Sequence, residues 1–565
     1  MRDKKTLTAV VAIVTVSLVV LGRQVVTHGV FSCLRDDTLF YLSWSRQMAE
    51  SLSSGVWYPR WMAESHSGYG NPTFIFYSPL TVYLTAVFKV ITGDLITAAM
   101  VVKLLGLTLS GLFMFMFIKD IWGPRAGLVA AIVYMAEPFR VFDIYFLGIH
   151  ASKFAYVWFP LILFYTRRAV LEEKAGTGTA GLAVSYGLLC LTHILSAYMF
   201  LPVLVAFGLF CAGRGGLKRA MARLAVAGSL SFALSAFYLV PVLAERSLVH
   251  FEMLLKDEIY HYWNNYLFFI LKPISPFNPL FYRYLARTVV TSAALGVSVY
   301  LLSRPSRKEA RGPLPAFFLG VVIFTLFIMT SMSGFLWANV PGMTQIQFPT
   351  RWAAILVFGS ACLSGAGAGF MDRNKSSLRT RAGAWLTIFI ISAAACAYYD
   401  IEIITRGCYF TPVDLAKLPD AQDVREYVPR NVSLEWLRYH SSEGNYAKII
   451  AQYPENIVTL DIKKWAPERR EFEIVTSSEA RLRVRTFYYP GWQAVINGSR
   501  ADISAEPVTG AMLINVPKGR SMVTLAFMDT PLRWAAKICS ALAWIGVIII
   551  YAGAFYSTRK RKLTV

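Results

Sequence analysis

The sequence contains few charged residues for its length. Only 16% of its 565 residues are Asp, Glu, Lys or Arg, whereas 56% are hydrophobic, and the mean hydropathy is +0.48. Several apolar runs reach the roughly 20 residues that cross a bilayer as a helix. The composition therefore excludes an ordinary soluble protein and predicts a mainly α-helical, polytopic membrane protein.

The Walker, thiol-redox and zinc-protease motifs are also missing. The chain has no Walker loop, no C-x-x-C pair and no H-E-x-x-H motif, so nucleotide-driven, thiol-redox and zinc-protease chemistry lack support. Of the seven cysteines, five lie in apolar segments. The other two, Cys33 and Cys408, either pair as a disulfide in an oxidising compartment or stay free.

Acidic residues are scarce as well. The 34 Asp and Glu residues face 56 Lys and Arg residues, which gives a net charge of +22. The basic residues gather in short gaps between apolar segments, such as Arg167-Arg168, Lys218-Arg219 and residues 559–562, as the positive-inside rule requires of cytoplasmic loops. No RNA- or DNA-binding motif accompanies them, so we expect membrane lipids as partners and no nucleic acid.

The apolar runs predict twelve membrane spans with both termini in the cytoplasm. They lie near residues 7–22, 95–118, 122–137, 149–166, 178–195, 196–212, 224–243, 287–302, 314–331, 350–370, 384–400 and 532–556. Residues 78–92 are apolar too, but a span there would place the basic loops 213–223 and 303–312 outside. We therefore expect that segment to be interfacial or re-entrant.

These spans divide the chain into three predicted parts. Residues 1–400 form a transmembrane module with outer loops at 23–94 and 244–286, residues 401–531 form an outer domain, and residues 532–565 form a last helix with a basic tail.

The outer domain changes character along its length. Residues 411–440 look partly helical, whereas from about residue 446 short stretches alternate apolar and polar residues, which is typical of strands. Asn497-Gly498 is a cue for a type I′ hairpin. The pattern predicts a small β-sandwich.

Two adjacent acids, Asp36 and Asp37, follow the first predicted span. After them, Tyr41, Trp44 and Met48 share one face of a predicted helix over 38–52, which suggests an interfacial helix with its aromatic rings at headgroup level. Asp36 and Asp37 either cap this helix or include a catalytic or metal-binding carboxylate. Asp36 is the better cap, and Asp37 the better base.

The loop after this helix is rich in aromatic residues and is shaped by Gly and Pro. Its rings either form a membrane belt or present a platform for a sugar ring or lipid chain; the platform candidates are Trp57, Tyr58, Trp61 and Tyr69. Two polar residues of the loop, Arg60 and His66, could contact a phosphate.

More polar residues fall at the predicted outer ends of spans. One group is either a set of ion pairs or a lining of a cavity, and consists of Glu137, Arg140, Asp143, His150 and Lys153. Three further candidates for substrate or phosphate contact are His193, Glu245 and Arg351. Among these, we favour Arg351 for phosphate, because a guanidinium makes paired, charge-assisted hydrogen bonds.

A series of short motifs resembles a known family. The motifs are W-x-x-x-M-A-E at 44–50, G-x-W-Y-P-R-W at 55–61, G-Y-G-N-P at 68–72, F-x-F-Y-S-P-L at 74–80, LTHILSAYMFLP at 191–202, FYLVPVLAE at 237–245, QFPTRW at 347–352, EYVPR at 426–430 and FYYPGWQAVING at 487–498. In this order they resemble the multi-spanning bacterial family named after 6-pyruvoyl-tetrahydropterin synthase and the related YfhO-like proteins, within the wider GT-C glycosyltransferase superfamily.

The resemblance implies an inverting glycosyltransferase in the bacterial cytoplasmic membrane. Such an enzyme takes a sugar from a polyprenyl-phosphate donor at the outer face and passes it to a glycan, lipid or protein acceptor. A first-loop carboxylate acts as base or metal ligand, which places that role on Asp37, with Asp36 as the alternate. If a divalent metal such as Mg or Mn takes part, its candidate ligands are Asp37, Glu137, Asp143 and His150.

Two other functions compete with this one. A transporter or flippase of lipid-linked saccharides would explain the many spans, and Lys103, inside an apolar helix, is the residue that favours it. A non-catalytic assembly factor for envelope glycans is the third reading.

Overall fold

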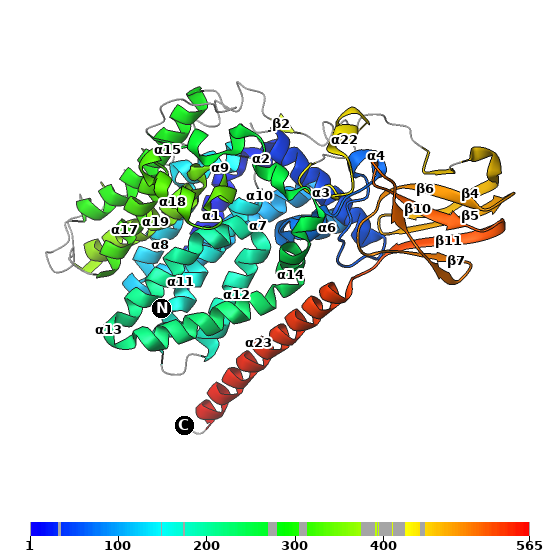
Figure 1. Cartoon of the computed structure of the whole chain (residues 1–565). Helices are drawn as coiled ribbons and strands as arrows, with labels where there is room; N and C mark the ends of the chain where they lie inside the picture. Colours follow the sequence, from blue (N-terminus) through cyan, green and yellow to red (C-terminus); the bar gives the residue numbers. More distant parts are fainter. Residues whose placement is uncertain are drawn as a thin grey trace.

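The chain forms a helical bundle with a β domain at one end (Figure 1). This computed structural model describes residues 2–31, 35–147, 150–172, 176–268, 279–303, 313–373, 383, 390–391, 394, 409–410, 424–440, 447–451 and 453–563. For some of these residues, Asp36 and Asp37 included, it describes the backbone and not the side chain. The expected partners Cys33 and Cys408 lie outside the described residues.

Apolar helices build the bundle around α19. The helices of this part are α1 (Arg2–Val20), α7 (Leu95–Trp122), α8 (Pro124–Ala136), α9 (Pro138–Phe146), α10 (His150–Ala155), α11 (Trp158–Leu171), α12 (Gly176–Thr192), α13 (Ile194–Leu234), α14 (Ala236–Glu245), α15 (Pro279–Leu302), α17 (Pro313–Ile328), α18 (Gly334–Asn339) and α19 (Ala353–Arg373). Phe358 of α19 contacts rings from α7, α8, α11, α13 and α17, namely Phe117, Tyr134, Phe159, Phe200 and Phe318. Interlocked aromatic rings thus make the centre of the bundle.

The structure bears out the membrane class but not the count of twelve spans. Within the described ranges, five helices are long and apolar enough to cross a bilayer: Leu95–Trp122, Ile194–Leu234, Tyr282–Leu302, Pro349–Arg373 and Pro531–Tyr556. Several other predicted spans form shorter helices, with 13 residues in α8, 14 in α11 and 17 in α12. The span expected at 384–400 lies outside the described residues except at 390–391 and 394.

The prediction of a basic loop at 213–223 is wrong, because these residues are mostly helical. Helix α13 continues through these residues to Leu234 and is interrupted at Gly213, where φ is 59° and ψ is −179°. The segment after Gly213 contains Leu, Lys, Arg, Ala and Met, which favour helix when no proline interrupts them. The cluster of basic residues predicted a loop here, but the helix propensity of the same residues determines the structure.

The first outer segment is a set of helices packed on the bundle. It contains α2 (Gly22–Thr27), α3 (Arg35–Ser53), α4 (Ser65–Gly68), α5 (Thr73–Phe76) and α6 (Pro79–Thr92). The predicted helix over 38–52 is confirmed, but its aromatic face is covered by protein rather than exposed to lipid. Tyr41, Trp44 and Met48 are buried against α6 and the following loop. The amphipathic pattern was right, and the partner of its apolar face is protein.

A G-x-G-x-x-G spacing at 176–181 serves helix packing. In dinucleotide-binding proteins such a segment follows a strand, but here it opens α12 after helix α11. A Cβ on Gly178 would lie 2.8 Å from the backbone nitrogen of Ala169, and one on Gly181 would lie 2.3 Å from the ring of Tyr165. These two glycines let α12 approach α11 closely.

The C-terminal domain is a β-sandwich, as the alternating pattern predicted. One sheet has the order β3 (Ile449–Ala451), β6 (Ala480–Phe487), β10 (Ala511–Val516), β9 (Ser504–Ala505). The other has the order β4 (Ile457–Ala466), β5 (Arg469–Thr476), β11 (Gly519–Phe527), β7 (Trp492–Ile496), β8 (Ser499–Ala501). All these pairs are antiparallel, and apolar residues of both sheets share one core. The β7–β8 turn has φ of 52° at Asn497 and 83° at Gly498, which confirms the type I′ hairpin.

Two elements connect the sandwich to the bundle. Helix α23 (Pro531–Leu563) leaves β11 and runs back along the outside of the bundle (Figure 1). In the first outer segment, β1 (Val30–Phe31) pairs with β2 (Tyr409–Phe410). Between β2 and the sandwich, helix α22 (Leu434–His440) bears out the expected helical character there, while residues 411–423 are not described.

Candidate functional site

The acidic pair opens helix α3. Because the helix already begins at Arg35, Asp36 and Asp37 lie in its first turn, and Asp36 is not the residue before the helix. Negative charge in a first turn is favoured by the helix dipole. Residue 37 precedes Tyr41 by four positions, so the two share one face of α3.

Tyr41 connects this helix to α10. Its ring stacks on His150, with ring centroids 4.0 Å apart and ring planes 4° from parallel. Its hydroxyl shares a hydrogen bond with Thr85 of α6. The start of α3 therefore lies beside the N-terminus of α10, although the two are more than a hundred residues apart in sequence.

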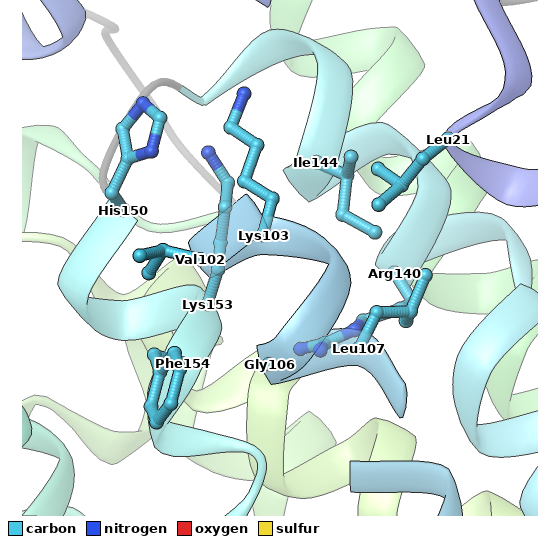
Figure 2. Close-up of a pocket in the computed structure, with 10 residues that line it drawn as sticks. All are labelled: Leu21, Val102, Lys103, Gly106, Leu107, Arg140, Ile144, His150, Lys153 and Phe154. Atoms are coloured by element: carbon cyan, nitrogen blue, oxygen red, sulfur yellow. The ribbon is translucent and has the colours of Figure 1, made fainter. Parts of the chain in front are cut away.

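Four nitrogen-bearing side chains surround a small cavity next to this contact. Lys103 comes from α7, Arg140 from α9, and His150 and Lys153 from α10. The cavity measures about 30 Å³. In Figure 2 the amines of Lys103 and Lys153 extend in the same direction as the ring of His150, while the guanidinium of Arg140 lies on the opposite side of the pocket. The predicted cavity lining thus includes Arg140, His150 and Lys153, with Lys103 added.

Each cation of this basic cluster (Lys103, Arg140, Lys153) has a partner within the protein. Lys103 Nζ donates a hydrogen bond of 3.0 Å to Gln24 Oε1 of α2. The guanidinium carbon of Arg140 lies 3.5 Å above the ring of Tyr156, as in a cation–π contact. Lys153 interacts electrostatically with Asp143. Positive charge is costly at such depth unless an anion or a partner meets it.

Three of the four residues expected to hold a divalent metal, Glu137, Asp143 and His150, have described side chains, and these do not make a site for one. Glu137 is fully buried between α8 and α9, near Ser292. Asp143 interacts with Lys153 and Arg140, and His150 faces Lys103 and Lys153. Among the described residues, no group of three or more His, Cys, Asp and Glu side chains is arranged to hold a metal. A divalent cation at these ligands would meet the basic cluster, so the donor set does not fit it.

His193 and Arg351 form a second polar group. His193 caps α13, and its Nδ1 lies 2.7 Å from Ser196 Oγ. Arg351 donates a hydrogen bond of 2.7 Å from Nη1 to the carbonyl of Ile346. The two side chains are close enough to interact electrostatically. They stay candidates for contact with substrate.

Three other predicted contacts are engaged within the protein. Arg60 Nε lies 2.9 Å from Asp529 Oδ1, and Arg60 is almost fully buried. Glu245 accepts hydrogen bonds from Arg533 and from Tyr489, at 2.7 and 2.8 Å. His66 is buried beside Asn71 at 3.4 Å. Arg60 and Glu245 join the β domain and α23 to the bundle, and we do not keep these three residues as phosphate ligands.

Most residues of the expected aromatic platform are also engaged within the protein. Trp61 is fully buried against Trp492 and Phe527 of the sandwich, with ring centroids 5.5 and 5.4 Å apart. Tyr69 stacks on Phe487 at 4.9 Å, and Tyr58 contacts Phe237 at 5.3 Å. In this group Trp57 is the exposed ring, at 82% of its surface. Trp61 and Tyr69 thus form part of the joint with the sandwich, whereas Trp57 stays a candidate for the platform.

A buried carboxyl at this joint makes a testable prediction. Burial raises the pKa of Glu468 from 4.5 to about 7, against the opposing effect of hydrogen bonds from the backbone N–H groups of Arg60 and Trp61 at 2.6 and 3.1 Å. The raised pKa means that the folded protein binds this proton more tightly than the unfolded chain does. The stabilising contribution is complete below pH 4.5 and is lost as the pH rises through about 7.

Glu468→Gln should flatten this pH dependence, because glutamine copies the neutral acid and can still accept the two hydrogen bonds. The difference in the free energy of unfolding between Glu468→Gln and the parent protein should change by up to about 3 kcal/mol between pH 4.5 and 8. This follows from about 1.4 kcal/mol per unit of pKa shift. Thermal unfolding in detergent, followed by tryptophan fluorescence, measures it. The exposed Glu455→Gln is the matched control. Parallel pH curves for Glu468→Gln and the parent would contradict the prediction.

The sequence does not reveal the partners of several residues that the structure makes important. Lys103 is a charged residue inside an apolar helix, which indicates a cavity. The sequence does not show which other residues line that cavity. Arg533 and Glu468 gave no signal, and Tyr41 gave only its place on a helix face, because the partners of all three come from distant parts of the chain.

Comparison with known proteins adds a family. The profile of the 6-pyruvoyl-tetrahydropterin synthase related domain, described as a membrane protein, matches residues 74–399. No curated protein sequence matches the chain.

Two solved structures share a distant likeness. ArnT from Cupriavidus metallidurans, bound to undecaprenyl phosphate, is 12% identical over 66% of this chain and 78% of its own, with a TM-score of 0.31. The oligosaccharyltransferase AglB from Archaeoglobus fulgidus, in complex with an inhibitory peptide and a dolichol-phosphate, is 15% identical over 78% of this chain and 63% of its own, with a TM-score of 0.37. At these scores the alignments assign no residue a role.

Proposed function

The chain belongs to the 6-pyruvoyl-tetrahydropterin synthase related family of membrane proteins, and we propose that it is a glycosyltransferase of the GT-C type. It takes a sugar from a polyprenyl-phosphate donor and transfers it, with inversion, to a glycan, lipid or protein acceptor of the cell envelope. The reaction takes place at the outer face of a bacterial cytoplasmic membrane, and both termini lie in the cytoplasm.

One observation carries this proposal. Helix α3, whose first turn bears two acids, contacts α10 through the Tyr41–His150 stack, and His150 lines the same cavity as the basic cluster. Glycosyl transfer from a lipid phosphate needs a base for the acceptor and positive charge for the departing phosphate. The two requirements are met by neighbouring elements.

The residues have distinct roles in the proposed reaction. Asp37 accepts the proton of the acceptor hydroxyl while the hydroxyl oxygen bonds to the anomeric carbon from the face opposite the phosphate. The bond between that carbon and the phosphate oxygen breaks, and its electron pair stays on the phosphate. Lys103, Arg140 and Lys153 stabilise the resulting negative charge, and Asp37 then releases its proton to water.

Reconstitution tests the function. The purified protein in liposomes receives polyprenyl-phosphate-linked sugars that carry a radiolabel in the sugar, together with acceptor lipids from the source membrane. We expect the label to move to the acceptor while polyprenyl phosphate without a sugar accumulates. Label that crosses the bilayer still bound to its carrier would identify a flippase, and label that does neither would favour an assembly factor.

A further inference from the structure

The basic cluster brings three cations from three helices to one cavity. Arg140 is 1% exposed and Lys153 is 7% exposed, and Lys103 lies inside the apolar helix α7. Lys103 and Lys153 are close enough that each affects the charge of the other, and both act on His150. Such crowding of like charge is unfavourable, and a nearby anion would relieve it.

The acidic residues near the cluster neutralise part of this positive charge. Asp143 interacts with Lys153 and Arg140. Glu137 interacts with Arg140 and with Ser292, but it does not itself line the cavity. Lys103 makes its described hydrogen bond to a neutral amide, that of Gln24. An anion at the cavity would therefore reduce the excess of positive charge, whereas a divalent cation would increase it.

We infer that Lys103, Arg140 and Lys153 bind the phosphate of the donor lipid directly, in the role that a divalent cation would otherwise take, so that binding is independent of metal. This deepens the proposed function and rests on it for the identity of the lipid. A guanidinium and two ammonium groups supply up to eleven N–H donors for the phosphate oxygens, about five from arginine and three from each lysine.

The geometry allows a phosphate to enter after small rearrangements. The cavity of about 30 Å³ exceeds the roughly 10–15 Å³ that one water molecule needs. The Lys103 and Lys153 amines that extend beside it (Figure 2) end flexible four-carbon chains, which can separate to admit a phosphate. Arg140 is less adaptable, because its guanidinium is stacked on Tyr156. The lysines would thus adjust around a fixed arginine.

Binding measurements test the inference without any assay of transfer. The purified, EDTA-treated protein in detergent is titrated with undecaprenyl phosphate, with undecaprenol as the phosphate-free control and inorganic phosphate as a third ligand. We expect undecaprenyl phosphate to bind with the same affinity, within twofold, in EDTA and in magnesium chloride. Binding of inorganic phosphate alone would support the metal-free anion site and make the ligand a free phosphate.

Lys103→Gln should weaken binding of undecaprenyl phosphate at least tenfold. Lys119→Gln is the matched control, because Lys119 lies on the same helix at its exposed end, and we expect less than a twofold change. Lys153→Gln repeats the test if Lys103→Gln does not fold. Unchanged binding in a folded Lys103→Gln or Lys153→Gln would overturn the inference.

Direct metal titration gives an independent result. Electron paramagnetic resonance with Mn²⁺ should show no saturable binding at one ion per chain. One bound Mn²⁺ that is lost in Asp143→Asn or His150→Ala, or loss of undecaprenyl phosphate binding in EDTA, would overturn the inference. The proposed transferase function would survive either result, since its own test is the movement of sugar to the acceptor.

Discussion

Asparagine in place of Asp37 should slow sugar transfer by about 10²–10⁴-fold, the range that a positioned general base contributes. Asparagine keeps the size of the side chain but cannot accept the proton of the acceptor hydroxyl. Residue 37 lies one turn before Tyr41, which is buried against α10 and α6. The loss should appear in kcat at equal amounts of folded protein, because the acceptor still binds.

Two matched variants separate base catalysis from helix capping. Asp36→Asn should have a smaller effect on kcat, because residue 36 does not share the face of Tyr41. Asp94→Asn is the control for an acid at a helix start, since Asp94 accepts a hydrogen bond of 2.7 Å from the backbone N–H of Thr97 at the head of α7. It should leave kcat unchanged. Normal transfer by the double variant Asp36→Asn, Asp37→Asn would end the catalytic assignment.

The features predicted correctly from the sequence are those with local causes. The alternation from about residue 446 predicted strands, and Asn497-Gly498 predicted a type I′ hairpin, because positive φ at two successive residues favours that pair. The spacing of Tyr41, Trp44 and Met48 predicted helix α3. In each case neighbouring residues alone determine the conformation.

The features that were missed depend on partners far away in the chain. An amphipathic face does not reveal whether lipid or α6 will cover it, so α3 was assigned to the membrane surface. Trp61 and Tyr69 looked like an open platform because their covering residues, Trp492 and Phe487, follow more than 400 residues later. Likewise, Lys103 could not be assigned to a cavity until α9 and α10 were placed beside α7.

Methionine in place of Glu245 should lower the free energy of unfolding by about 3–5 kcal/mol, the usual cost of removing one partner of a buried ion pair. Arg533 pairs with Glu245 at 2.7 Å, and the side-chain exposures are 0% and 6%. Without Glu245 the guanidinium is left buried beside Tyr489 and the carbonyl of Pro490, with no carboxylate to balance it. Unfolding in detergent, monitored by far-UV circular dichroism, measures the change.

Two further variants test whether unpaired charge is the cause. The double variant Glu245→Met, Arg533→Met should recover much of the lost stability, because neither charge is then buried alone. Arg520→Met is the matched control: Arg520 forms an ion pair of the same length, 2.7 Å, with Glu473 on the sandwich surface, where solvent screens it. It should unfold like the parent protein. A double variant as unstable as Glu245→Met alone would contradict the explanation.

The location of the pair also predicts where unfolding begins. Glu245 ends α14, Arg533 lies in the first turn of α23, and Tyr489 precedes β7, so one ion pair joins the bundle, the last helix and the sandwich. Only 11% of the most apolar stretch of α23 is buried in the protein, so the ion pair at its start is expected to matter for its attachment. In Glu245→Met, amide hydrogens at the start of α23 and the end of β11 should therefore exchange before those of α19. Simultaneous exchange of all three would mean that the ion pair stabilises the whole fold rather than the joint.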